Sequence, residues 1–134
     1  MEQRGQAGVE YLIIIGFVAF ATIGILSLAY IYSGLSNDQI RLNQAENFAV
    51  KLINSAESVF FAGEPSETTI SLYLPEGVQD VNISSGGVLL TVSTSTGKNV
   101  RFFTSRVPLQ GTLSSSSGIK TVSLRALEDH ILIE

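Results

Sequence analysis

The chain contains no cysteine and no tryptophan, and it has one histidine and three prolines in 134 residues. Without cysteine, disulfides, thiol catalysis and cysteine metal sites are excluded. The few basic residues, such as Arg41, Lys98, Arg101 and Lys120, are scattered, so no basic patch with interleaved aromatic residues indicates nucleic acid. The sequence also has no glycine-rich phosphate loop followed by a helix and no nucleophile with an evident base. We therefore predict a chain that is not an enzyme and binds no nucleic acid and no cofactor.

The single histidine stands beside two carboxylates, Glu128 and Asp129, which raises the question of a metal site. We expect the last strand to run from His130 to Glu134. Adjacent side chains on a strand point to opposite faces. The pattern therefore predicts a structural histidine and no bound metal.

The 27 residues from Tyr11 to Asn37 carry no formal charge and are rich in isoleucine, leucine, phenylalanine, valine and alanine. A helix of about 20 such residues spans the hydrocarbon core of a bilayer. Ala19-Phe20-Ala21 fits a signal-peptidase site, but the apolar run continues well beyond it. A retained membrane helix is therefore favoured over a cleaved signal peptide. A plain membrane anchor explains this length but leaves the carboxylate of Glu10, at the edge of the run, unexplained.

The stretch RGQAGVEYL, residues 4–12, directly precedes the apolar run and resembles the class III signal peptide of archaeal type IV pilins. In that family the mature chain begins with glutamine, and the motif reads roughly Gln-x-Ser-x-Glu-Tyr-Leu. Gly8 stands where serine is usual, and both residues are small. The positions that match are Gln6, Glu10, Tyr11 and Leu12.

The resemblance implies cleavage between Gly5 and Gln6 by a membrane-embedded prepilin peptidase at the cytoplasmic face. Gly5 has no Cβ to obstruct the protease, and Arg4 fits the positive-inside side of the membrane. After cleavage, the resemblance implies that Glu10 pairs with the terminal amine of Gln6 in a neighbouring subunit. The alternative is that Glu10 only favours the positive end of its own helix dipole.

After residue 35 the pattern changes from uniformly apolar to amphipathic. Spacings of three and four predict a helix to about residue 61 that packs one face on a folded domain. Ser36-Asn37-Asp38 is an alternative joint with a new helix start, and Gly63-Glu64-Pro65-Ser66 ends the helix. The apolar positions on the predicted face are Leu42, Ala45, Phe48, Ala49, Leu52, Ile53, Ala56, Val59 and Phe60.

The remaining residues, 63–134, read as strands separated by turns that contain glycine, proline and serine. We expect six or seven strands in an antiparallel sandwich or small barrel. The predicted strands cover residues 68–74, 78–83, 88–92, 100–104, 119–124 and 130–134. Asn82-Ile83-Ser84 is the one Asn-x-Ser/Thr sequon and makes Asn82 a candidate glycosylation site.

The expected fold is α+β, with a long N-terminal apolar helix whose C-terminal half packs on a β-rich head. The expected parts are a leader (1–5), a transmembrane or filament-core helix (6–35), its amphipathic continuation (36–62) and the head (63–134).

The resemblance implies a subunit of a cell-surface filament, which is inserted in the membrane as a precursor and then bundled through its N-terminal helices. Its implied partners are further copies of itself, the prepilin peptidase, an assembly ATPase and a membrane platform protein. Two alternatives stay open: a minor pilin or pseudopilin of a secretion or adhesion system, and a membrane-anchored β domain that never polymerises.

Overall fold

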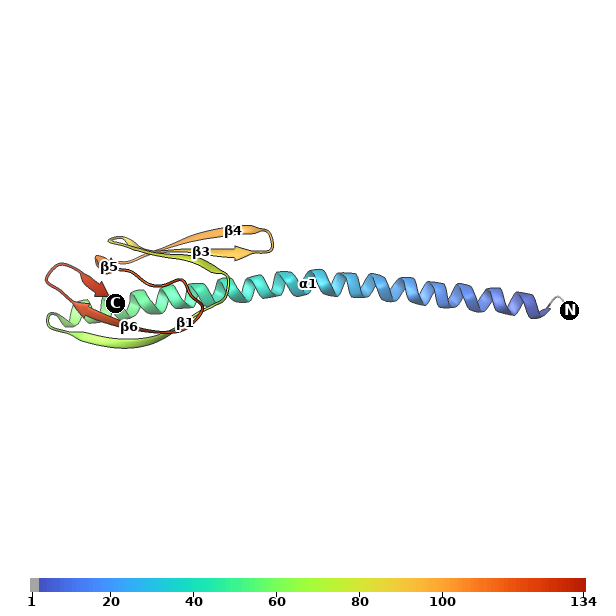
Figure 1. Ribbon diagram of the computed structural model, residues 1–134, viewed down its shortest axis with the longest axis horizontal. Coiled ribbons are helices and arrows are strands. Elements are labelled where there is room, and N and C mark those ends of the chain that lie inside the picture. The colour runs from blue at the N-terminus through green and yellow to red at the C-terminus, as the bar shows by residue number, and fades with distance from the viewer. Residues whose placement is uncertain (1–2) are drawn as a thin grey trace. The chain divides into compact units, whose positions relative to one another are not determined.

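The computed structural model describes the backbone of residues 3–134 and the side chains of residues 8–134 (Figure 1). It contains one helix and seven strands, an α+β architecture as the sequence predicted. The elements are α1 (Gln3–Ala62), β1 (Glu67–Leu74), β2 (Val78–Ser84), β3 (Gly87–Thr94), β4 (Gly97–Thr104), β5 (Leu109–Gly111), β6 (Gly118–Ala126) and β7 (Ile131–Ile133).

The chain divides into two compact units after residue 37. The first holds the apolar part of α1. The second, residues 38–134, holds the rest of α1 and all seven strands, and we call it the head.

The head contains two separate sheets. This excludes the small closed barrel that the sequence had left open as an alternative to a sandwich. One sheet has the strand order β1-β6-β7-β5 and the other has the order β2-β3-β4. Every pairing is antiparallel except that of β5 with β7. β5 does not pair with β6, the next strand in the chain, but with β7, and the two strands run in the same direction. This parallel pair departs from the predicted antiparallel arrangement.

The core of the head lies between one face of α1 and the inner faces of both sheets. The helix face is the predicted one: its residues at spacings of three and four are buried from Leu42 to Val59, and Phe60 packs partly against them. Val88, Leu90 and Val92 from β3 and Leu124 from β6 belong to the same cluster, together with residues of the other strands. In Figure 1 both sheets lie along this part of α1.

Carboxylates on α1 hold the β3–β4 hairpin in addition to the apolar contacts. Asp38 accepts hydrogen bonds from the backbone N–H of Ser95, at 2.8 Å, and from its hydroxyl, at the tip of the hairpin. Farther along the helix, Glu46 forms an ion pair of 3.0 Å with Arg101 of β4. These polar contacts fix the position of the hairpin along the helix.

The ends of the elements follow the turn residues of the sequence. α1 ends at Ala62, and Gly63 adopts a φ of +82°, the left-handed conformation that commonly terminates helices. The predicted strands are found with ends that differ by at most a few residues. The short strand β5 was not predicted, because three residues beside a proline give no alternating pattern.

Candidate functional site

The most unusual surface of the molecule is the apolar segment, which we define as residues 9–35 of α1. Every residue from 8 to 37 is exposed. The exposed fraction of the large apolar side chains here ranges from 51% at Leu35 to 83% at Tyr30. By length and composition the helix can cross a membrane. A surface of this kind needs lipid or other protein to cover it.

Two hydroxyl groups within the apolar segment are hydrogen-bonded to the helix itself, as a bilayer requires. Thr22 donates a hydrogen bond to the carbonyl oxygen of Val18, and Ser27 donates one to that of Ile23, each at 2.8 Å. Bonding of this kind to the preceding turn satisfies a hydroxyl that has no water to bond. These two polar residues therefore do not disqualify the segment as a membrane helix.

Tyrosines stand near both ends of the apolar segment. Tyr11 and Tyr30 are 19 residues apart, which corresponds to about 28 Å of helix. The hydrocarbon core of a bilayer is about 30 Å thick, and tyrosine is enriched at both of its interfaces. Sequence reasoning included Tyr11 only as part of a motif and missed Tyr30. The spacing of the two tyrosines, read against the bilayer thickness, was the signal that could have identified it.

Glu10 lies one residue before Tyr11, at the end of the apolar segment, and is exposed. No residue among 8–134 forms an ion pair with it. Tyr11 and Leu12 are exposed as well. The other predicted site residues, Arg4, Gly5 and Gln6, lie outside the residues whose side chains the structure describes. The predicted cleavage site and the pairing of Glu10 with a terminal amine therefore remain predictions.

Three glycines within the apolar segment leave open space on the helix surface. A Cβ added at Gly16, Gly24 or Gly34 would meet no atom within 4 Å. Small residues let membrane helices approach each other closely. The segment thus offers positions where the backbone of a second helix can come near.

No protein-family model matches the chain, and comparison with curated proteins and with solved structures finds no similar protein. The function must therefore be inferred from the chain's own residues.

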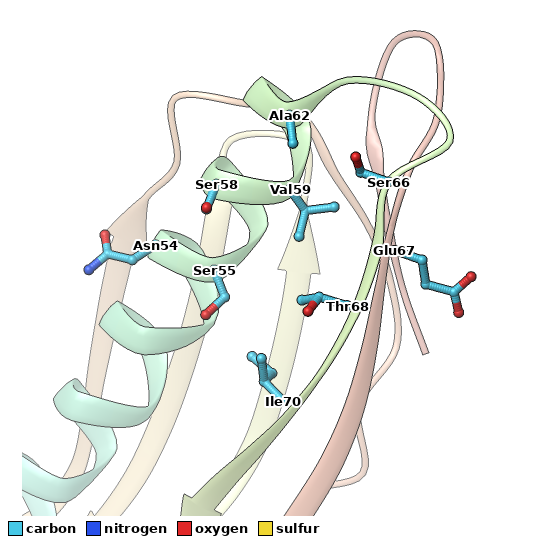
Figure 2. Close-up of a pocket in the computed structure, with 9 residues that line it drawn as sticks. All are labelled: Asn54, Ser55, Ser58, Val59, Ala62, Ser66, Glu67, Thr68 and Ile70. Carbon is cyan, nitrogen blue, oxygen red and sulfur yellow. The ribbon is translucent and has the colours of Figure 1, made fainter.

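A groove of about 520 Å³ lies in the head between the end of α1 and the start of β1 (Figure 2). Ser55, Ser58 and Thr68 contribute hydroxyl groups to its lining. The carboxylate of Glu67 points away from these hydroxyls in Figure 2, and it accepts hydrogen bonds from Ser123 and Arg125. The groove thus contains hydroxyl groups with no base directed at them, and it gives no arrangement for nucleophilic catalysis.

The histidine does not lie where the sequence suggested. His130 and Asp129 are in the turn before β7, and not on a strand, because β7 begins only at Ile131. Their side chains are therefore free to meet, and Nδ1 of His130 lies 2.6 Å from Oδ1 of Asp129. This hydrogen bond lowers the pKa of Asp129. Within residues 8–134 the structure has no group of three side chains that could hold a metal ion.

Proposed function

We propose that this protein is the structural subunit of a helical cell-surface filament of the type IV pilus kind. In this proposal the precursor spans the membrane with its apolar segment and the head outside the cytoplasm. The chain is cleaved between Gly5 and Gln6, and copies then assemble by packing their apolar segments together. The head coats the filament and performs no catalysis.

The observation that carries the proposal is the contrast between the apolar segment and the head. The head buries its own apolar face of α1, whereas the large side chains of residues 9–35 are all at least half exposed. Lipid tails are as apolar as the helix surface, so the hydrophobic effect does not drive helices together in the membrane. Close packing of small and apolar side chains has to favour the helix bundle instead. Copies that associate through non-identical surfaces form an open helix when the arrangement does not close.

Glu10 supports an assembling helix over a simple anchor. Where packed copies of the apolar segment exclude water, the carboxylate of Glu10 is costly unless it has a partner. An amine at Gln6 would lie about one helical turn away, so a neighbouring copy shifted along its axis can supply the partner. A buried pair of this kind specifies register more surely than it adds stability.

The first experiment is N-terminal sequencing and intact mass of the protein from the surface of its native cells. The proposal expects a start at Gln6 or its pyroglutamate. A start at Met1 would instead support the membrane-anchored domain that does not polymerise. A start at Thr22 would mean a secreted head and would refute the proposed role of the helix.

A second experiment tests the assembly role of Glu10. The variant Glu10→Ala should be processed normally but should give at least about tenfold less protein in sheared filaments, since a register-setting pair is lost. Glu2→Ala is the matched control, because that carboxylate is removed with the leader, and its filament yield should equal the wild type. Normal filaments from Glu10→Ala would refute the pairing.

A further inference from the structure

The outer face of the sheet β2-β3-β4 carries exposed apolar side chains beside the sequon. Val100 and Phe102 alternate with inward residues of β4, and their side chains are 58% and 53% exposed. β4 is an edge strand of this sheet. Apolar groups on an exposed edge strand invite association with other chains unless something covers them.

The strand register places Asn82 in one row with this apolar surface. Asn82 of β2 is directly opposite Leu89 of β3, and Leu89 is directly opposite Phe102 of β4. Directly opposed residues lie on the same face of a sheet. Asn82 is exposed and Leu89 is half-buried. Val88 and Leu90, the residues before and after Leu89 in β3, are buried on the other face of the sheet. We call Asn82, Leu89 and Phe102 the outer row.

Both side chains of the sequon lie on this exposed face. Asn82 and Ser84 both lie on the exposed side of β2, two residues apart, with Ile83 packed against the core between them. The Asn82 amide makes no hydrogen bond with another side chain of residues 8–134, so no protein contact competes for its nitrogen. Ser84 is the last residue of β2, and its hydroxyl donates a hydrogen bond of 3.2 Å to the carbonyl oxygen of Gly87, across the turn that leads to β3.

We propose that Asn82 carries an N-linked glycan whose first sugars lie over Leu89 and Phe102. In the transfer, the Asn82 amide nitrogen bonds to the anomeric carbon of a lipid-linked oligosaccharide. The bond from that carbon to the lipid phosphate breaks, the phosphate leaves with the electron pair, and the amide proton passes to a base of the transferase. No oxidant or reductant is needed.

The geometry of the row explains why the glycan covers these two residues. Neighbouring strands are about 4.8 Å apart, so Leu89 lies one strand spacing and Phe102 two spacings from Asn82. The first two sugar rings of a chain directed across the strands reach this far. Sugar rings present apolar C–H faces that pack on aromatic rings, and covalent attachment gives a high effective concentration.

The charges around the row fit a neutral covering better than a second copy of this chain. Asp80 lies on the same face of β2, and Lys98 lies on the same face of β4. An uncharged glycan covers the apolar centre without burying either charge, whereas a protein partner would have to pair or desolvate both. The proposal rests on the part of the proposed function that puts the head outside the cytoplasm.

The modification is tested on protein taken from native cells, by mass spectrometry of the tryptic peptide that ends at Lys98. We expect a glycan mass on this peptide, lost completely in Asn82→Gln and in Ser84→Ala, and kept in the matched variant Ser84→Thr. An unmodified Asn82 in the surface protein would overturn the proposal. If Asn82 were unmodified and Phe102→Ser abolished the filaments, a second copy of this chain would be the occupant of this face.

The covering of Phe102 has its own test, the melting temperature of the full chain in detergent with and without the glycan. Loss of the glycan in Asn82→Gln should lower Tm by about 2–5 °C. In the Phe102→Ala background, loss of the glycan should leave Tm unchanged. In the Tyr73→Ala background, where the substitution is on the other sheet, loss of the glycan should lower Tm as much as in the wild type. An equal decrease of Tm in both backgrounds would refute the proposal that the glycan covers Phe102.

The same preparations separate this inference from the proposed function. A chain that starts at Gln6 but lacks the glycan refutes only the inference. A chain that starts at Met1 and carries the glycan refutes only the processing.

Discussion

At the scale of single residues, two carboxylates of the head accept hydrogen bonds that lower their pKa, and this makes the stability of the head depend on pH. The hydroxyl of Ser95, and then its backbone N–H, lower the pKa of Asp38 below the usual value of 3.8. Hydrogen bonds from Arg125 and then Ser123 lower that of Glu67 below 4.5 in the same way. A carboxylate whose pKa is lower in the folded state binds its proton more readily in the unfolded chain.

Acid should therefore destabilise the head in a defined range of pH. The contribution of Asp38 is complete above about pH 5 and is lost as the pH falls through 3.8 and then through its lower folded-state pKa. We expect Tm of the full chain in detergent to fall between pH 5 and pH 3. In Asp38→Asn, Tm should be lower at pH 7 and should fall less steeply on acidification.

The control for this prediction is Asp80→Asn, an exposed carboxylate of β2 that makes no hydrogen bond with another side chain of residues 8–134. Its acid response should equal that of the wild type. If Asp38→Asn also retained the full wild-type response, the bond to Ser95 would have no part in the acid sensitivity.

At the scale of elements, α1 within the head has one buried face and one exposed face, and two phenylalanines test the difference. The side chain of Phe48 is 2% exposed in the core, whereas that of Phe61 is 71% exposed. Phe48→Ala should lower the free energy of unfolding by about 3–5 kcal/mol through lost burial and the remaining cavity. Phe61→Ala should cost less than about 1 kcal/mol, because only its edge-to-face contact with Phe60 is lost.

Urea unfolding of the full chain in detergent, followed by near-ultraviolet circular dichroism, measures both values. If Phe48→Ala prevents folding, Phe48→Leu provides a milder test, with an expected loss smaller than that of Phe48→Ala because less buried volume is removed. Similar losses for Phe48→Ala and Phe61→Ala would mean that the helix does not pack on the sheets by the face described here.

The elements also show what the sequence could predict. The face of α1 from Leu42 to Val59 was predictable because apolar residues recur at helical spacing, and most strands were predictable because apolar and polar residues alternate. The parallel pairing of β5 with β7 was not, because strand partners depend on tertiary packing rather than on local pattern. The turn position of His130 was missed because apolar neighbours on one side extended the apparent strand.

The candidate site was predictable to a similar degree. The apolar segment follows from the uncharged run that begins at Tyr11, and the sequon follows from three residues. The outer row did not, because Asn82, Leu89 and Phe102 are far apart in the sequence, and only the strand register brings them together.

At the scale of the whole molecule, the division of burial predicts how the two units behave when they are separated. Every buried apolar side chain of residues 8–134 lies between Leu42 and Ile133, in the head. The apolar segment contributes none of them, so the folding of the head should not require it. We therefore expect residues 38–134, expressed alone, to form a soluble folded monomer, whereas the full chain should require membrane or detergent.

Three measurements on the same fragment decide this prediction. Its Tm should lie within about 5 °C of the head transition in the full chain, since less than about 1 kcal/mol of stabilising contact is removed. Phe48→Ala should destabilise the fragment and the full chain equally, because the mutated core is the same in both. Sedimentation should show a monomer, since the apolar segment that copies would share is gone. An unfolded fragment would mean that residues 8–37 contribute to the stability of the head, and a folded but polymerising fragment would place the assembly surface on the head instead of on the apolar segment.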